Sequence, residues 1–182
     1  MNYKSVNPYD GSINLEIECW SATEIENALQ KSSQVRDSWQ KTPLDKRCKL
    51  LKQAANALRD QKEVLAKMMA SEMGKLFDEA KAEVEKCAWV CEFYALNAKG
   101  FLADRMIQSD ASKSFITYQP IGCVLAIMPW NFPLWQVFRF AAPALAAGNV
   151  GLLKHAENVP ESLLPLRRFF VMLDSLMVPL FP

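Results

Sequence analysis

Two short segments of the chain carry polar side chains where they could act on a ligand. The first is the turn 129–133, Pro-Trp-Asn-Phe-Pro, which holds Asn131 between two prolines. A neutral side-chain amide fixed in this way can stabilise an oxyanion that develops on a carbonyl, without charging the site beforehand. The alternative is a turn asparagine that bonds its own backbone. The turn lacks a Gly-x-Gly-x-x-Gly pattern, so the phosphates of any dinucleotide must be held differently.

The second segment runs from Lys154 to Glu157, directly after an apolar run. A cation and a carboxylate within one turn could share the hydroxyls of a ribose, the lysine donating and the glutamate accepting. The alternative is a solvated strand end. His155 is the only histidine of the chain, which excludes a His-based metal cluster and a Ser–His triad built from this chain.

The five cysteines predict packed thiols. Cys87 and Cys91 lie four residues apart and could share a metal, but without a second pair or a nearby histidine two core thiols fit better. Cys123 begins an apolar run, where we expect a buried and inert thiol. An odd cysteine count without Cys-x-x-Cys spacing, and an N-terminus without a basic-then-apolar leader, predict free thiols in the cytoplasm.

Composition excludes several classes of function. The 182 residues are 51% hydrophobic and 23% charged, as in a globular chain that buries a core. The formal net charge of +1 gives no field that attracts nucleic acid or an anionic membrane, so we expect neither as a partner. The most apolar stretch, 120–153, is interrupted by polar residues and predicts a core segment instead of a membrane span.

The first hundred residues predict a short strand followed by helices. Residues 13–19 alternate with a period of two, as in a strand. Ser21 and Glu24 then form a capping box at the start of a helix that extends to about residue 40. Gly74 and Gly100 each mark a helix end. The three further helices are expected to begin at 42–43, to cover about 62–73, and to cover about 78–99.

The remainder predicts a parallel sheet. Residues 113–118 alternate, and 123–128 form a continuous apolar run of the length of a strand buried on both faces. A helical pattern over 134–147 and a second apolar run over 150–154 complete a βαβ unit with a right-handed crossover. The fold class is therefore α/β. Ligands of open parallel sheets bind beyond the carboxyl ends of the strands, where both polar segments lie.

These segments together closely resemble the aldehyde dehydrogenase superfamily. The resemblance rests on the 129–133 turn and on Lys154 three residues before Glu157, and extends to further segments. Those are Asn7-Pro8, 72–75 (Glu-Met-Gly-Lys), 119–122 (Gln-Pro-Ile-Gly) and 142–149 (Ala-Pro-Ala-Leu-Ala-Ala-Gly-Asn). It implies the N-terminal part of a cofactor-binding domain, and oxidation of a small aldehyde to the acid with NAD or NADP through a cysteine thiohemiacetal.

The resemblance also implies roles for individual residues. Asn131 would hold the oxyanion, Trp130 would contact the cofactor, and Lys154 and Glu157 would hold the adenosine ribose. Residues 112–122 match the strand that joins subunits into homo-oligomers.

Arg139, six residues after Pro133, resembles the arginine that binds the substrate carboxylate in succinate-semialdehyde dehydrogenases. A planar guanidinium suits bidentate carboxylate binding. The alternative is an arginine that caps a neighbouring carbonyl.

The resemblance covers residues 1–160 and leaves 161–182 as a non-family tail. Pro165 falls within the helix that the family has at this place, where a proline would break it. If the codons of the tail are read in another frame, the encoded sequence has the pattern of an amphipathic helix followed by a turn. We therefore interpret the tail as a segment translated out of frame. The family's nucleophilic cysteine and general-base glutamate would lie beyond residue 182, so we expect the chain alone to be inactive. Two alternatives are a non-catalytic fragment that pairs with intact subunits and an unrelated helical scaffold with a small α/β cap.

Overall fold

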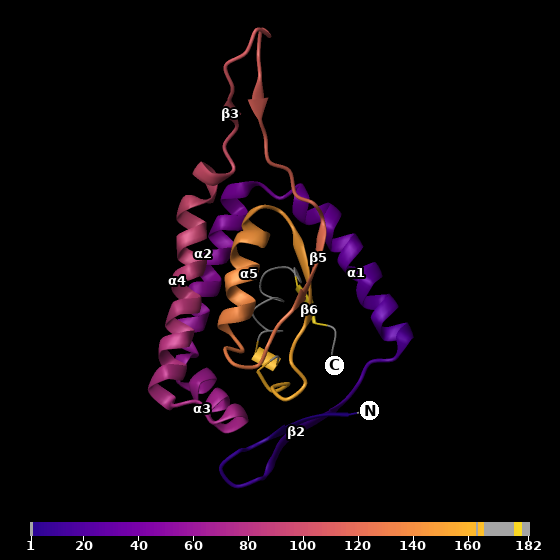
Figure 1. Ribbon diagram of the computed structural model, residues 1–182, viewed down its shortest axis with the longest axis vertical. Helices are drawn as coiled ribbons and strands as arrows, with labels where there is room; N and C mark the ends of the chain where they lie inside the picture. The colour runs from indigo at the N-terminus through magenta and orange to yellow at the C-terminus, as the bar shows by residue number, and fades with distance from the viewer. Residues whose placement is uncertain (1, 163, 166–176, 180–182) are drawn as a thin grey trace.

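The computed structural model describes residues 2–162, 164–165 and 177–179. Figure 1 shows the arrangement of its elements. The helices are α1 (Ala22–Gln40), α2 (Leu44–Asp60), α3 (Lys62–Met73), α4 (Phe77–Phe101) and α5 (Trp135–Ala146). The strands are β1 (Asn2–Val6), β2 (Ile13–Glu18), β3 (Arg105–Met106), β4 (Phe115–Ile116), β5 (Cys123–Ile127), β6 (Val150–Lys154) and β7 (Met177–Pro179).

The strands of the described part of the chain form three separate small sheets. β1 and β2 are an antiparallel hairpin at one end of the molecule, and β3 and β4 form a second hairpin that projects from the other end (Figure 1). β5, β6 and β7 form a parallel sheet in that order. The predicted βαβ unit, β5–α5–β6, is therefore confirmed.

Helices lie on both sides of the parallel sheet. α5 packs against β6 on one side and against α4 on its other side, while α1 packs against β5, β6 and β7 from the opposite face. α2 and α3 pack against α4 and extend this helical layer (Figure 1). The sheet thus has helices on both of its faces, as parallel sheets usually do, although one face of β5 stays exposed.

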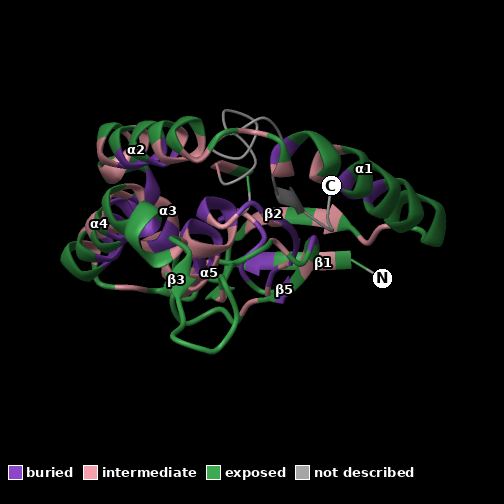
Figure 2. Cartoon of the chain, turned by 90° about the horizontal axis from the view of Figure 1, so that it is seen from above, coloured by how far each residue is buried: buried purple, intermediate pink, exposed green. Residues whose placement is uncertain are grey.

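The hydrophobic core lies between α5 and the helices around it. Figure 2 shows buried residues concentrated on the inner faces of the helices and on the parallel sheet. The carbonyls at the end of α5 are also satisfied from this layer. Trp39 Nε1 donates to Leu145 O at 3.1 Å, and Arg47 Nε donates to Ala146 O at 3.0 Å. Buried helix ends need such partners, and here they tie α1 and α2 to α5.

Local signals placed most helix ends correctly. The capping box of Ser21 and Glu24 is present, and α3 ends at Gly74 in the left-handed conformation, with φ 71°. Gly100, however, does not end α4, which continues to Phe101. The prediction was wrong because a glycine within an exposed last turn weakens a helix only modestly, and the packing of α4 outweighs that effect.

The strands β1 and β3 were not foreseen. β1 pairs with the predicted strand β2, and β3 pairs with β4. The alternating segment 113–118 contains only the two-residue β4. Strands as short as β3 and β4, with two residues each, leave little periodic signal in the sequence.

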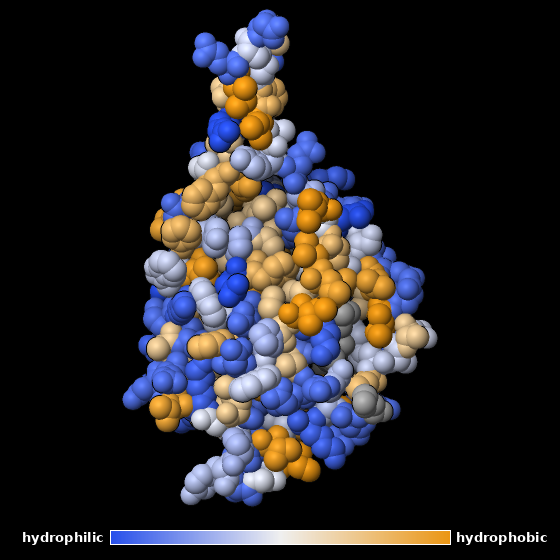
Figure 3. Space-filling model, viewed as in Figure 1, coloured by the Kyte–Doolittle hydropathy of each residue, from blue (hydrophilic) through white to orange (hydrophobic). Residues whose placement is uncertain are grey.

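The apolar run 123–128 is a strand, but the expectation that both its faces are buried was wrong. Cys123, Leu125 and Ile127 are exposed, whereas Ala126 is buried. β5 lies at the edge of the sheet order, and apolar side chains gather along it on the surface in Figure 3. The predicted burial of the Cys123 thiol was therefore also wrong.

The parallel sheet has one strand more than the βαβ unit supplies. β7 pairs with β6, with Met177 opposite Gly151 and Pro179 opposite Leu153. β7 belongs to the segment 161–182 that was set apart as a tail. Most of that segment, 163 and 166–176 and 180–182, lies outside the described residues, and the boundary at residue 160 stays a prediction.

Among the described residues, no helix combines the length and hydropathy of a membrane span.

Candidate functional site

The turn 129–133 follows β5 and presents Asn131 at the surface. Trp130 and Asn131 are exposed, while Pro133 and Leu134 are buried. The Asn131 side chain makes no hydrogen bond with any residue that the structure describes, its own backbone included. The turn therefore has a buried base and an apex whose amide has no partner within the described part of the chain.

Both ends of this turn are tied to the end of β6. Met128 N donates to Lys154 O at 2.9 Å at the start of the turn, and the His155 ring lies 3.0 Å from Pro133 O at its end. Ala156 N donates to His155 Nδ1 at 2.9 Å, so Nδ1 accepts and Nε2 carries the proton that is donated to Pro133 O. The sequence-predicted segments at Asn131 and Lys154 are thus brought together by the parallel pairing of β5 and β6.

His155 is held in its neutral form. Its side chain is fully buried, and burial lowers the pKa of His155 to about 4, with the nearby Lys154 acting in the same direction. Hydrogen bonds to the carbonyls of Pro133 and Met128 oppose this shift. The imidazole therefore binds both ends of the turn without a charge at neutral pH.

Helix α4 fixes the segment that follows the turn. Glu83 Oε1 accepts from Leu134 N and from Trp135 N, each at 2.9 Å. A carboxylate at the first amides of α5 satisfies donors that have no partner within the helix and complements the helix dipole. Sequence reasoning missed this role, because Glu83 lies 51 and 52 residues before the two amides it caps.

Glu83 is one half of a buried ion pair. Its other carboxylate oxygen binds Lys75 Nζ, and the two side chains are only 1% and 5% exposed. Lys75 Nζ also lies 3.8 Å from the centroid of the Phe132 ring, within the turn itself. Lys75 belongs to the 72–75 motif that carried the resemblance, but its contact with the turn is visible only in the structure.

The predicted ribose-binding pair, Lys154 and Glu157, lies beside the N-terminal hairpin. Glu157 is exposed and Lys154 is half-exposed, with its Nζ 5.9 Å from the centroid of the Tyr3 ring on β1. The pKa of Tyr3 is raised by burial, by its interaction with Cys19, and by the charge of Glu157. Tyr3 is therefore a neighbour of the pair that the sequence did not indicate, since β1 itself was not foreseen.

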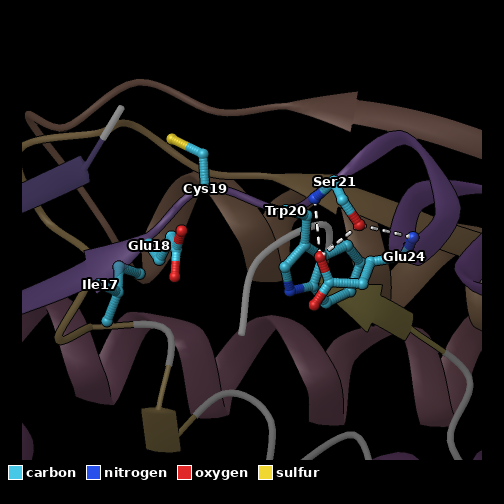
Figure 4. A pocket seen from close by; sticks show the side chains of 6 residues that line it. All are labelled: Ile17, Glu18, Cys19, Trp20, Ser21 and Glu24. Atoms are coloured by element: carbon cyan, nitrogen blue, oxygen red, sulfur yellow. Dashed lines mark hydrogen bonds between the residues drawn. The ribbon is translucent and has the colours of Figure 1, made fainter.

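A groove of about 440 Å³ opens where β2 leads into α1. Figure 4 shows Glu18, Cys19 and Trp20 along it, with Ser21 and Glu24 bonded to each other. Those last two side chains are occupied by the capping box. Cys19 and Glu157 both raise the pKa of Tyr3. This groove therefore lies close to the Lys154–Glu157 pair.

A second groove, of about 290 Å³, borders the turn on the α4 side. Phe132 and Trp135 form one wall, and Lys86 Nζ lies 4.1 Å from the centroid of the Trp135 ring. Arg139 lies one helical turn after Trp135. Its side chain is exposed and bonds no residue that the structure describes, so it is not the carbonyl cap that the alternative required.

Glu72 holds the chain where it leaves the site. Its buried carboxylate accepts from Glu161 N at 2.5 Å, from Ser162 N at 2.9 Å and from the Ser162 hydroxyl. Burial raises the pKa of Glu72 to about 7, although these hydrogen bonds act in the opposite direction. The motif 72–75 thus supplies two anchors, one for residues 161–162 and one for the turn.

The cysteines are free thiols, as predicted. Cys87 and Cys91 are buried in the core, and burial raises the pKa of both, to about 12 for Cys91. Within the described part of the chain, no three His, Cys, Asp or Glu side chains are grouped as a metal site would need.

Comparison with known proteins gives a consistent result. The model of the aldehyde dehydrogenase family matches residues 1–174. A Synechocystis sp. protein, named as a probable NADP(+) succinate-semialdehyde dehydrogenase, is 47% identical over 170 residues, and the Escherichia coli NAD(P)+ succinate semialdehyde dehydrogenase is 44% identical over 156. These alignments cover 93% and 85% of this chain, but 37% and 34% of the relatives.

A solved structure of the same family has the same fold over this part of its chain. The succinic semialdehyde dehydrogenase of Streptococcus pyogenes, in complex with NADP+, superposes with a TM-score of 0.92 at 31% identity, covering 99% of this chain and 40% of that one. The turn, the paired strands behind it and the residues at the end of β6 thus lie in a fold and a sequence context that these proteins share. The chain belongs to the aldehyde dehydrogenase family.

Proposed function

We propose that this chain forms the N-terminal part of the cofactor domain of an NAD(P)-dependent enzyme that oxidises succinate semialdehyde to the acid. The observation that carries the proposal is the Asn131 amide, exposed and without a partner among the described residues, on a turn tied to both strands. A donor held in a fixed position stabilises a developing oxyanion without reorganising during the reaction. The names of the two relatives compared above support the choice of substrate.

The residues at the ends of β5 and β6 fit a dinucleotide. Lys154 and Glu157 lie beyond the carboxyl end of β6, where open parallel sheets bind such ligands, and both reach solvent. We propose that they hold the adenosine ribose, the lysine as donor and the glutamate as acceptor, while the exposed Trp130 contacts the cofactor. NAD or NADP, when bound, accepts the hydride that the aldehyde loses.

Arg139 is the proposed contact for the substrate carboxylate. It is exposed, one turn along α5 from the wall of the groove beside the 129–133 turn, and no described residue neutralises its charge. An arginine in that state can bind a carboxylate through two parallel hydrogen bonds.

The 182-residue chain alone is proposed to be inactive. The thiolate is the nucleophilic form of cysteine, and the raised pKa values of Cys48, Cys87 and Cys91 disfavour it. We also propose a cytoplasmic location, which the five free thiols support.

A second candidate function is supported by the β3–β4 hairpin. It projects from the body and exposes Met106, Phe115 and Ile116. Exposed apolar residues on a strand edge favour pairing with another chain. The chain would then act as a non-catalytic fragment that pairs with intact subunits, through the segment 112–122 that resembles the family's subunit contact.

The proposed function is tested in a chimera, in which residues 1–160 replace the matching segment of the E. coli relative. We expect turnover of succinate semialdehyde, with a loss of about 10²- to 10³-fold in kcat on Asn131→Ala. Arg139→Ala should raise KM for succinate semialdehyde far more than KM for an uncharged aldehyde of similar length. Equal effects on the two aldehydes would contradict the role of Arg139, and an unchanged kcat would contradict that of Asn131.

The chain by itself is the matched control. It should produce no NAD(P)H from succinate semialdehyde, and mixing it with the intact relative should leave the activity per intact subunit unchanged. A change in that activity, together with co-elution of the two chains, would favour the interaction fragment.

A further inference from the structure

His155 is a fully buried ionisable side chain next to the candidate site, and the proposed chemistry gives it no part. It directly follows Lys154, the last residue of β6, and its ring points back to the turn that carries Asn131. The two halves of the candidate site, the turn after β5 and the pair after β6, meet at this one side chain.

The contacts of His155 bracket the turn. Its Nε2 donates to Pro133 O at 3.0 Å, and its ring also interacts with the carbonyl of Met128, the residue before the turn. The backbone of the preceding residue adds a parallel link, from Met128 N to Lys154 O. Residues 154 and 155 therefore bind both ends of a five-residue turn whose middle residue, Asn131, is exposed.

We propose that His155 is a positioning residue, whose neutral Nε2–H form fixes the Asn131 turn against the Lys154–Glu157 segment. Its role as a positioner of Asn131 rests on the proposed function, whereas the anchoring of the turn stands by itself. Of the two neutral tautomers, only this one serves Pro133 O and Ala156 N–H together, because Ala156 N–H needs an acceptor at Nδ1 and Pro133 O needs a donor at Nε2.

Burial reinforces this choice of form. The side chain is 0% exposed, and a charged ring would meet Lys154 beside it and the Ala156 N–H in place of an acceptor. The low pKa of His155, about 4, follows from that burial. The anchor thus keeps one hydrogen-bonding pattern throughout the neutral range.

The first test is nuclear magnetic resonance of the full 182-residue chain. The nitrogen chemical shifts of the His155 ring should show a protonated Nε2 and an unprotonated Nδ1 at pH 7. A protonated Nδ1, or a charged ring at that pH, would overturn the proposal. The measurement needs neither cofactor nor turnover, so lack of enzyme activity in the chimera would count against the proposed function alone.

The second test compares His155→Gln with His155→Phe. The glutamine amide can donate to Pro133 O in place of Nε2, whereas phenylalanine fills the ring volume and donates nothing. In the phenylalanine variant we expect the Asn131 side-chain signals to shift and amide exchange of Met128 to rise about tenfold, as expected for the loss of one hydrogen bond. The glutamine variant should restore most of the native pattern.

The indole N–H signal of Trp39 is the control for the fold. This N–H donates to Leu145 O in the core, away from the turn 129–133. Unchanged Asn131 signals and Met128 exchange in the phenylalanine variant would overturn the proposal. If both variants lost the Trp39 signal, they would be unfolded, and the nitrogen chemical shifts of the His155 ring in the native chain would then test the proposal. A ring protonated at Nδ1 instead of Nε2 would overturn it.

Discussion

Replacing Glu83 by alanine should strongly destabilise the protein, although Glu83 lies on α4, far along the chain from the turn it stabilises. The carboxylate is 1% exposed, binds Lys75, which is 5% exposed, and caps two amides of α5. Its removal leaves a buried ammonium without a counter-charge and two helix N–H groups without an acceptor.

The magnitude follows from these contacts. Removing one partner of a buried ion pair costs about 3–5 kcal/mol, because the other charge stays buried. For a chain of this length, each kcal/mol lowers Tm by about 2–4 °C, so Glu83→Ala should lower Tm by roughly 6 to 20 °C. Glu83→Gln keeps an oxygen for the two amides but not the charge, and should fall between alanine and the native residue.

Glu85→Ala is the matched control, on the same helix and with the same substitution. Glu85 pairs with Arg59 and Lys62 at the surface, where its side chain is 45% exposed, and exposed pairs contribute about 0–1 kcal/mol. Thermal unfolding followed by circular dichroism measures both variants. If Glu83→Ala were no more destabilising than Glu85→Ala, the buried pair would not be the anchor of α5.

Three further outcomes can be measured on the same chain. Burial raises the pKa of Glu72 to about 7 from an ordinary value near 4.5, so the folded state binds its proton more tightly than the unfolded state. The free energy of unfolding should therefore fall by up to about 3 kcal/mol as pH rises from 4.5 to 7, and thermal melts should show a flatter pH dependence for Glu72→Gln. Gly74→Ala should destabilise by about 1–3 kcal/mol in urea titration, because φ is 71° there and a Cβ would lie 3.0 Å from Pro8 Cγ. Gly100→Ala should instead stabilise by about 0.5–1 kcal/mol, because that glycine lies inside α4 with no atom within 4 Å of a Cβ; a loss of stability there would contradict the helical assignment.

Local patterns in the sequence were enough for several elements, among them the βαβ unit that carries the site. The capping box at Ser21, the left-handed end at Gly74 and the two apolar runs of the βαβ unit each depend on neighbouring residues, and all three are present in the structure. The parallel order of β5 and β6 then brought Asn131 and Lys154 to the same edge of the sheet. The family also followed from the sequence, because its motifs are short and contiguous.

What the sequence did not reveal depends on residues that are distant along the chain. Glu83 caps amides 51 and 52 residues later, and Glu72 binds residues 161–162. Tyr3 lies beside the Lys154–Glu157 pair, on a strand that has little periodic signal. The exposure of Cys123 was likewise set by the position of β5 at the edge of the sheet. Composition and periodicity report what each residue prefers locally, whereas buried charges and edge strands obtain their partners only when the tertiary fold closes.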